Sequence, residues 1–323
     1  MKVLVTGGAG FIGSAFVRLF VDNAFPEMSE VIVLDKLTYA GSWENLQSVT
    51  PHHQIKIVEG DICDNTKVTE LISEVDCIIN FAAESHVDRS ISNSLPFLQS
   101  NFVGLGTILD AAQKCNPKVR IVQISTDEVY GSKPTGQSKE NDILDPNSPY
   151  AASKGGSDLL AMSFHRTFKS NLVVTRACNN YGPYQHPEKF IPRVITNLIR
   201  GQRIPIFGDG SNQREWIHVD DHCLGIYLAA INGNAGEVFN IGSGFSLSNL
   251  DLAQLILEKM DKSDDLIEFV VDRLGHDLRY SLDSSKILDE LGFQAVTDFD
   301  SGISETIRWY QDQQHWWASK VLG

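Results

Sequence analysis

The 323-residue sequence lacks the main features of membrane, secreted and nucleic-acid-binding proteins. It contains no run of about 18 apolar residues, so no membrane span is expected. Its first residues, "KVLVTGG", read directly as a strand and not as a signal peptide. Basic residues are few, 27 Lys and Arg against 41 Asp and Glu, and the net charge of −14 argues against a nucleic-acid partner. A few arginines in a cleft could still bind a small anionic ligand.

Cysteine is also scarce, and its placement shows no pairing pattern. The five cysteines are odd in number and scattered, with no C-x-x-C pair: Cys63, Cys77, Cys115, Cys178 and Cys223. This usage predicts reduced thiols, a cytoplasmic location and no structural zinc. The segment "HVDDHC", residues 218–223, mixes metal-ligand types. Two acids opening a helix favour capping and a dipole interaction there over a metal site.

Short apolar runs alternate with amphipathic segments through the first half of the chain. The runs are rich in Val and Ile and lack strict alternation, as in strands buried on both faces of a parallel sheet: "KVLVT", "VIVLD", "IKIVEG", "DCIINFAA", "RIVQIS" and "LVVTRA". Helices are predicted between them over residues 11–23, 67–73, 103–114 and 150–168. Repeated strand–helix units predict an α/β fold with a doubly wound parallel sheet of the Rossmann type.

The length predicts two lobes that share a cleft. We expect a dinucleotide-binding domain over residues 1–180, with some later segments returning to it. A smaller mixed α/β substrate domain is expected over residues 181–323, where the pattern loosens into "YGPYQHPEKFIPR" and "FGDGSNQREW". Further helices are predicted over residues 250–259 and 303–310.

A glycine-rich turn follows the first predicted strand in "VTGGAGFIGS". Gly7, Gly10 and Gly13 would let the backbone approach a pyrophosphate at a helix N-terminus, although tight turns also use glycine. Asp35 ends the next strand, where a carboxylate would accept bonds from ribose hydroxyls and repel a 2′-phosphate. The pattern therefore predicts NAD and not NADP. Asp61 in "GDI" could meet the adenine amino group or could be a solvated turn acid.

Two further pairs of residues suggest a reacting centre. Tyr150 and Lys154, in "SPYAASKGG", are four apart at the start of a predicted helix and so share a face. A nearby ammonium and a cationic nicotinamide would lower the tyrosine pKa, whereas the ordinary alternative is a surface tyrosine. Asp127 and Glu128 end the strand in "ISTDEVYGS". They are either an exposed turn or a general acid and base, because two close carboxylates cannot both ionise cheaply.

Six motifs carry a resemblance to a known family: "TGGAGFIG", "FAAESHVDRSI", "STDEVYGS", "NSPYAASKGGSD", "NNYGPYQHPEK" and "DRLGHDLRYSLD". The chain resembles the nucleotide-sugar branch of the extended short-chain dehydrogenases, and within it most closely the dTDP-glucose 4,6-dehydratases. The resemblance extends almost from end to end, and the acid pair in "STDEVYG" is its most specific element. Leu274 stands where many members have proline, and Ser100 where many have threonine.

The resemblance implies conversion of dTDP-glucose to a 4-keto-6-deoxy sugar nucleotide and water, with NAD regenerated. Tyr150 would take the C4 hydroxyl proton during oxidation, Thr126 would hydrogen-bond that hydroxyl, and Lys154 would tune Tyr150 and bind the nicotinamide ribose. Glu128 would remove the C5 proton, and Asp127 would protonate the departing C6 hydroxyl. Which acid holds the proton does not follow from the residues themselves. The resemblance also implies a homodimer formed through helices of the cofactor domain.

The same resemblance assigns the remaining site residues. It implies a cofactor site of Gly7, Gly10, Phe11, Ile12, Gly13, Asp35, Lys36, Leu37, Thr38, Asp61, Ile62, Phe81, Ala82, Ala83, Ser85, Ser100, Tyr150, Lys154 and Asn180. It implies a substrate site of Ser85, Thr126, Asn179, Lys189, Phe190, Pro205, Phe207, Arg214, Asn249, Arg273 and His276. Alternatives are a UDP- or CDP-hexose dehydratase, a 4-epimerase, which needs no acid pair, and an inactive NAD-binding regulatory protein.

Overall fold

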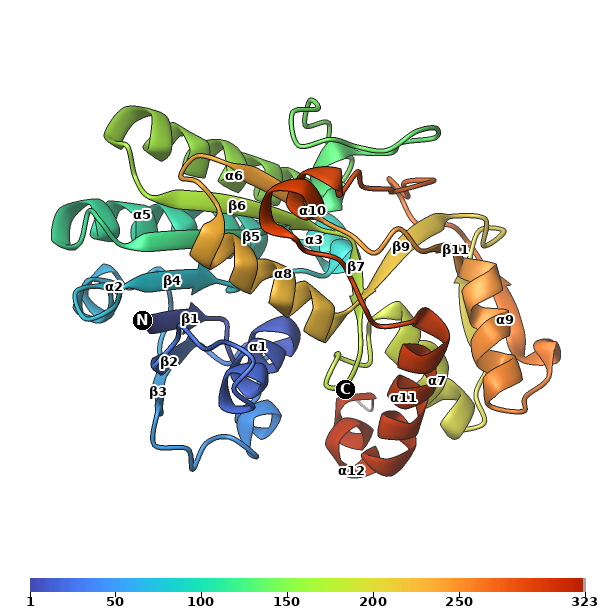
Figure 1. The fold of residues 1–323 in the computed structure, drawn as a ribbon. Coiled ribbons are helices and arrows are strands. Elements are labelled where there is room, and N and C mark those ends of the chain that lie inside the picture. Colours follow the sequence, from blue (N-terminus) through green and yellow to red (C-terminus); the bar gives the residue numbers. More distant parts are fainter. Residues whose placement is uncertain (322–323) are drawn as a thin grey trace.

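The computed structural model describes residues 1–321, which form two lobes (Figure 1). The larger lobe is built on a seven-stranded sheet in the order β10-β6-β5-β4-β1-β2-β3, and every neighbouring pair is parallel. Its strands are β1 (Lys2–Thr6), β2 (Glu30–Asp35), β3 (Ile55–Glu59), β4 (Cys77–Asn80), β5 (Arg120–Thr126), β6 (Leu172–Ala177) and β10 (Val238–Ile241). The predicted doubly wound fold is confirmed, and the strand order reverses between β1 and β4.

Helices cover both faces of this sheet. One face carries α1 (Phe11–Val21), α8 (Val219–Asn232) and α10 (Ser285–Leu291), and the other carries α2 (Asn65–Ile72), α5 (Gly104–Cys115) and α6 (Pro149–Phe168). Alternate residues of one strand enter different cores: Val3 and Val5 pack toward α1 and α8, and Leu4 packs toward α2 and α5. Burial on both faces explains why the strand sequences do not alternate.

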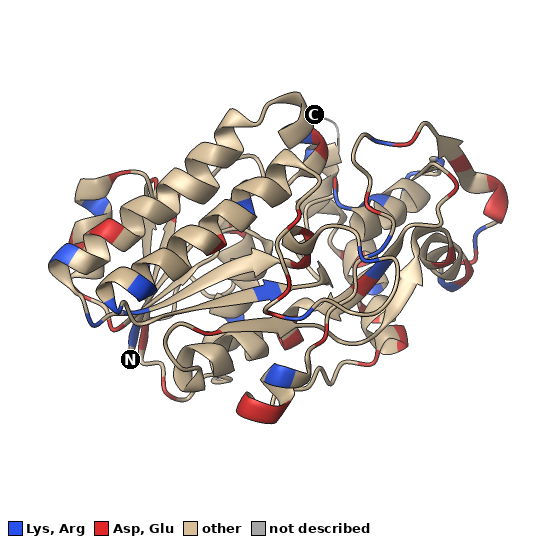
Figure 2. Cartoon of the chain, turned by 90° about the horizontal axis from the view of Figure 1, so that it is seen from above, with Lys and Arg blue, Asp and Glu red and all other residues tan. Residues whose placement is uncertain are grey.

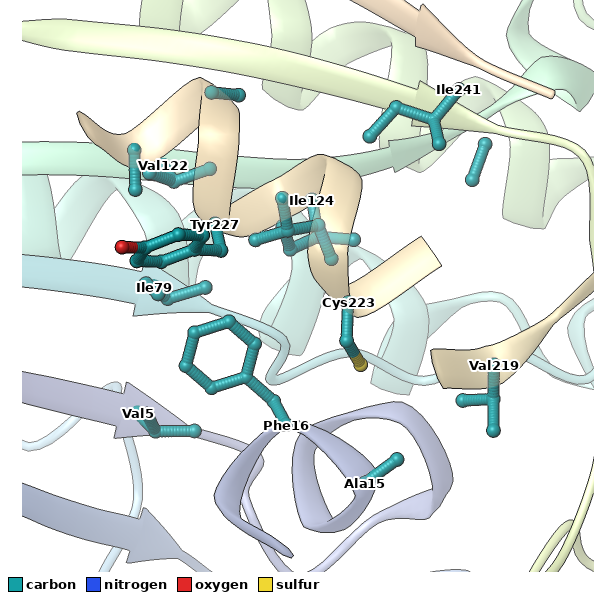
Figure 3. Packing of buried hydrophobic residues seen from close by; sticks show 14 of the residues in the cluster. Val5, Ala15, Phe16, Ile79, Val122, Ile124, Val219, Cys223, Tyr227 and Ile241 are labelled. Atoms are coloured by element: carbon teal, nitrogen blue, oxygen red, sulfur yellow. The ribbon is translucent and has the colours of Figure 1, made fainter. Parts of the chain in front are cut away.

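Helices α1 and α8 pack against each other, although they are about 200 residues apart in the sequence. Phe16 of α1 stacks on Phe25 at 4.4 Å, and Phe25 stacks on Tyr227 of α8 at 4.7 Å between ring centroids. Figure 3 shows Phe16 and Tyr227 beside Ile79 of the sheet. Residues 219–241 therefore belong structurally to the larger lobe, although they lie beyond residue 180.

The smaller lobe lies at the carboxyl ends of the large sheet's strands (Figure 1). It contains a three-stranded sheet of β7 (Asn179–Tyr181), β9 (Gln213–His218) and β11 (Ser246–Ser248), and a parallel pair of β8 (Ile204–Phe207) and β12 (Ile267–Val270). Its helices are α7 (Phe190–Ile199), α9 (Asn249–Lys259), α11 (Phe299–Asp312) and α12 (Gln314–Trp317). A separate apolar core around Tyr310 and Ile303 holds these elements together.

Short elements complete the structure: η1 (Trp43–Leu46), α3 (Val87–Ser92), α4 (Leu95–Phe97), the π-helix η2 (Leu98–Val103), η3 (Asp127–Tyr130), η4 (Asp264–Leu266) and η5 (Ala318–Val321). All six predicted helices are present, with ends that differ by a few residues. The first ends at Val21 and not at residue 23, because Asn23 adopts a left-handed conformation with φ 62°. No helix within residues 1–321 is long and apolar enough to cross a membrane.

Candidate active site

A cleft with a cavity volume of about 310 Å³ lies where the strand order reverses, between the two lobes. This is the position at which doubly wound sheets bind their ligands. All five predicted catalytic residues line it: Thr126, Asp127, Glu128, Tyr150 and Lys154. So do the predicted cofactor residues apart from Leu37 and Asp61, and the predicted substrate residues Ser85, Asn179, Lys189 and Phe190.

The glycine turn packs so closely against neighbouring backbone that two of its positions have no room for a side chain. Gly7 has a φ of +67°, and a Cβ atom on it would lie 2.5 Å from the backbone nitrogen of Ala82. A Cβ atom on Gly13 would lie 2.4 Å from the carbonyl oxygen of Gly7. Gly10 precedes α1 without a side-chain cap. The first N–H groups of α1 therefore open into the cleft and fit a pyrophosphate.

Asp35 is buried at the end of β2. Its Oδ2 accepts a hydrogen bond from the Ala9 N–H at 2.9 Å, and its Oδ1 accepts one from the Leu37 N–H at 2.8 Å. Burial raises the pKa of Asp35, although these two N–H groups act in the opposite direction. The backbone thus fixes a buried carboxylate at the cleft, and its contact with an adenosine ribose stays a prediction.

Asp61 lies behind the cleft lining and pairs with a lysine. Its Oδ2 is 3.4 Å from Nζ of Lys36, which also donates to Oγ of Ser100 at 3.0 Å. Partial burial would raise the pKa of Asp61, but the Cys63 N–H and the charge of Lys36 outweigh it and lower that pKa. A contact of Asp61 with adenine stays a prediction.

Tyr150 and Lys154 enter the cleft from the first turns of α6, which Ser148 caps by accepting from the Ala151 N–H at 3.1 Å. The Lys154 ammonium donates to the Ile124 carbonyl at 2.5 Å, and burial lowers its pKa to about 8. Burial and the charge of Glu128 raise the pKa of Tyr150. The rise follows from enclosure of the phenol beside a carboxylate, and the lowering expected from Lys154 with a cationic nicotinamide stays a prediction.

The acid pair lies in a buried 3₁₀ turn, η3, directly after β5, and not in a solvated turn. Thr126 Oγ1 donates to Asp127 Oδ1 at 3.1 Å and accepts from the Glu128 N–H at 3.3 Å. Within residues 1–321, the buried Oδ2 of Asp127 has no hydrogen-bond partner. Burial raises the pKa of Asp127 well above its usual value, and the charge of Glu128 adds to the rise.

Glu128 differs from Asp127 because it faces three cations. Burial raises the pKa of Glu128 as well, but Arg273, Arg214 and Lys189 oppose that rise. The pKa is therefore raised more strongly at Asp127 than at Glu128, which makes Asp127 the better proton donor of the two. Figure 2 shows acidic residues over both lobes and basic residues among them where the lobes meet. The local cations at the cleft are thus compatible with the net charge of −14.

The other predicted substrate residues lie in the smaller lobe beside the cleft and do not line it: Pro205, Phe207, Arg214, Asn249, Arg273 and His276. Arg214 donates to the Asp277 carbonyl at 2.8 Å, and its guanidinium lies 4.4 Å from the centroid of the Tyr280 ring. The imidazole of His276 lies 6.3 Å from the Phe207 ring. Their roles stay predictions.

Several cleft residues were not predicted as site residues from the sequence, among them Glu84, Gln185, His186, Glu188, Trp216 and His222. Nδ1 of His222 lies 2.8 Å from the Asn180 side-chain oxygen, and burial lowers the pKa of His222 to about 3. His218 instead caps α8 by accepting from the Asp220 N–H at 3.3 Å. Among the described residues, no group of three or more side chains could hold a metal ion. Three of these residues, Gln185, His186 and Glu188, lie in the motif "NNYGPYQHPEK", which could have indicated them.

A doubly wound sheet, a glycine turn at the switch point and a buried Tyr-Lys pair define a short-chain dehydrogenase of the extended type. The chain belongs to the family described as GDP-mannose 4,6 dehydratase, which matches residues 4–306.

Within this family, two relatives of high sequence identity are named for the same activity. A dTDP-glucose 4,6-dehydratase of Streptomyces niveus is 49% identical over 98% of this chain and 95% of its own length. The structure of DesIV, a dTDP-glucose 4,6-dehydratase from Streptomyces venezuelae with NAD and dTDP bound, superposes with a TM-score of 0.98. It is 49% identical and covers 99% of this chain and 100% of the other. A UDP-glucuronic acid 4-epimerase from Bacillus cereus is only 26% identical, with a TM-score of 0.90, 97% coverage of this chain and 99% of the other.

Proposed function

We propose that this protein is a dTDP-glucose 4,6-dehydratase that uses NAD and converts dTDP-glucose to dTDP-4-keto-6-deoxy-glucose and water. The observation that carries the proposal is the buried Asp127–Glu128 pair in one cleft with Tyr150 and Lys154. An epimerase of this fold needs the Tyr-Lys pair but has no use for two further acids of unequal pKa. The relatives named for the dehydratase activity are also far more similar in sequence than the epimerase.

NAD fits the residues of the larger lobe. The turn through Gly7, Gly10 and Gly13 would hold the pyrophosphate, and Asp35 would hold the adenosine ribose and exclude a 2′-phosphate. Bound NAD supplies the acceptor for the hydrogen removed from C4 and the donor for its return at C6.

Three residues act on the C4 hydroxyl. Tyr150 accepts its proton, and Thr126 hydrogen-bonds its oxygen. Burial and Glu128 raise the Tyr150 pKa, so the phenolate needs cationic support. Lys154, four residues along the same helix, would give this support, and a bound positive nicotinamide ring would add to it. Oxidation at C4 then acidifies the C5 proton.

The acid pair carries out the loss of water. Ionised Glu128 removes the C5 proton, protonated Asp127 donates its proton to the departing C6 hydroxyl, and Glu128 returns a proton to C5. Both pKa values are raised, that of Asp127 more strongly, so Asp127 is the better proton donor and Glu128 the better proton acceptor of the pair. Arg214, Arg273 and Lys189, whose charges act on Glu128, would hold the substrate diphosphate.

Mass spectrometry of reactions with dTDP-, UDP- and CDP-glucose tests the proposal. We expect loss of water from dTDP-glucose and little change in the other two nucleotides. Loss of water mainly from UDP- or CDP-glucose would change the substrate assignment. Inversion at C4 without loss of water would indicate an epimerase, and binding without any conversion would indicate a regulatory protein.

We further propose a homodimer formed through α4, η2 and α6, which contact one another. Five apolar side chains on these helices are exposed, at 39–71% of their surface: Leu95, Leu98, Phe102, Val103 and Leu159. Apolar groups gathered in this way favour association with a second copy. Leu98→Asp should give monomers in sedimentation, whereas Ile143→Asp, at an exposed position elsewhere, should not. The free cysteines of residues 1–321 support a cytoplasmic location.

A further inference from the structure

Glu188 is the centre of a polar cluster at the rim of the cleft. Its side chain is only 14% exposed, and its Oε2 lies 3.2 Å from Nη2 of Arg89 and 3.6 Å from Nε2 of His86. Its Oε1 lies 3.8 Å from Nδ1 of His186. Burial lowers the pKa of both histidines, which leaves the ion pair with Arg89 as the main contact of the Glu188 carboxylate.

Tyr39 extends this cluster to the other side of the rim. The Arg89 guanidinium lies 3.7 Å from the centroid of the Tyr39 ring, a distance typical of a cation–π contact. The same ring packs edge-on against His186 at 5.5 Å. Arg89 is thus held between an aromatic face and the carboxylate of Glu188.

The cluster joins three chain segments that are far apart in sequence. Tyr39 follows β2, Arg89 and His86 follow β4, and Glu188 precedes α7 of the smaller lobe. Each segment also lines the dinucleotide cleft, through Thr38 and Ala40, through Glu84 and Ser85, and through Gln185 and His186. The cluster therefore ties the two lobes together at the rim of the cleft that fits NAD.

We propose that Tyr39, Arg89 and Glu188 form an interlobe clasp that retains NAD between turnovers. The cleft that would hold the dinucleotide is lined by the segments that the clasp joins, so opening of these contacts would ease its departure. NAD is regenerated in every catalytic cycle and does not have to leave the protein. Slow dissociation of NAD therefore keeps the protein ready for the next turnover. The clasp acts on the rate of NAD dissociation and not on the chemistry at C4, C5 or C6.

The small-lobe segment that carries Glu188 is also held in place by contacts of the residues just before it. Gln185 Nε2 donates to the Asn180 carbonyl at 2.8 Å, and the Arg18 guanidinium lies 4.2 Å from the Tyr184 ring. Loss of the Glu188 charge would therefore release the rim locally without unfolding the segment.

The test compares NAD dissociation from wild-type protein and from Glu188→Gln. Each protein is loaded with NAD and diluted, and NAD in the filtrate is measured over time by enzymatic cycling. Removing one partner of a partly buried charge pair acts mainly on dissociation, and we expect about tenfold faster NAD loss. Glu44→Gln is the matched control. It breaks the Lys320–Glu44 pair, 3.0 Å long, which also joins the lobes although neither residue lines the cleft. Its NAD loss should equal that of the wild type.

Tyr39→Leu gives an independent test if Glu188→Gln does not fold, because it removes the ring from a loop and leaves the carboxylate in place. It should also speed NAD loss several-fold. An unchanged rate in a folded Glu188→Gln protein, or in Tyr39→Leu if only that variant folds, overturns the clasp. Equal acceleration in Glu44→Gln overturns it too, because any loosening of the lobes would then suffice. Failure of the proposed function is distinct: the wild type itself would then bind no NAD or form no product.

Discussion

Replacing one member of the acid pair at a time separates the elimination of water from the oxidation that precedes it. In Asp127→Asn the hydrogen bond from Thr126 to Oδ1 can remain, because that oxygen is kept. The atom replaced is Oδ2, which is buried and has no partner within residues 1–321, and which we expect to carry the proton. In Glu128→Gln the backbone bond to Thr126 is untouched. Each change therefore removes a proton transfer and little else.

The size of the effect follows from the roles of these groups. General acid or base catalysis contributes about 10²- to 10⁴-fold, which corresponds to about 2.7–5.4 kcal/mol of activation free energy. We expect turnover of dTDP-glucose to fall by this factor in each variant. Oxidation at C4 should persist, since Tyr150, Lys154 and Thr126 keep their contacts.

Stopped-flow mixing of each variant with dTDP-glucose provides the assay. Reduced nicotinamide absorbs near 340 nm, and we expect this absorbance to rise toward one equivalent per site and to decay slowly. In the wild type the signal should stay small, because elimination consumes the intermediate. Normal turnover in both variants would mean that the pair is structural. Lost turnover without the absorbance would mean that the pair positions the sugar, and either result would refute the acid–base assignment.

Three further predictions concern single residues. Tyr150→Phe should lower turnover by at least about 100-fold while calorimetry still detects dTDP-glucose binding; near-normal turnover would exclude Tyr150 as the base. Protein denatured after purification should release NAD, because the buried Asp35 carboxylate repels a 2′-phosphate; a predominance of NADP would contradict this. Asp127→Asn should raise the melting temperature at pH 7, corresponding to about 1 kcal/mol. The raised pKa of Asp127 means that its contribution to stability is present below pH 3.8 and is lost as pH rises through the folded-state pKa. The advantage of the variant should therefore shrink toward pH 4, and a lower melting temperature at pH 7 would contradict the raised pKa.

The parts of the fold that depend on local sequence were predictable. Val3, Leu4 and Val5 are all buried on alternating faces, so an unbroken apolar run was a sound sign of a parallel strand. The glycine turn and the Tyr150–Lys154 spacing are also local, and both lie in the cleft as expected. The helix ends were less accurate, because conformations such as the left-handed Asn23 leave little trace in periodicity.

Features assembled from distant segments could not be read from the sequence in the same way. Burial by surrounding elements, together with Glu128, sets the direction of the Tyr150 pKa, and the sequence does not reveal that enclosure. The cluster of Tyr39, Arg89 and Glu188 joins residues up to 149 positions apart, so no spacing rule could find it. The larger pKa rise at Asp127 likewise follows from its environment, since Arg214 and Arg273 oppose the pKa rise at Glu128.

The return of α8 and β10 to the large sheet has a consequence for how such a protein can diversify. The chain enters the smaller lobe after β6, comes back for residues 219–241, and leaves again toward β11. Neither lobe is encoded by one continuous segment of the gene. A single recombination event therefore cannot replace one whole lobe and leave the other intact. A protease that cuts one crossing would leave a nicked but associated protein. New sugar specificities in this architecture therefore have to arise by changing loops in place.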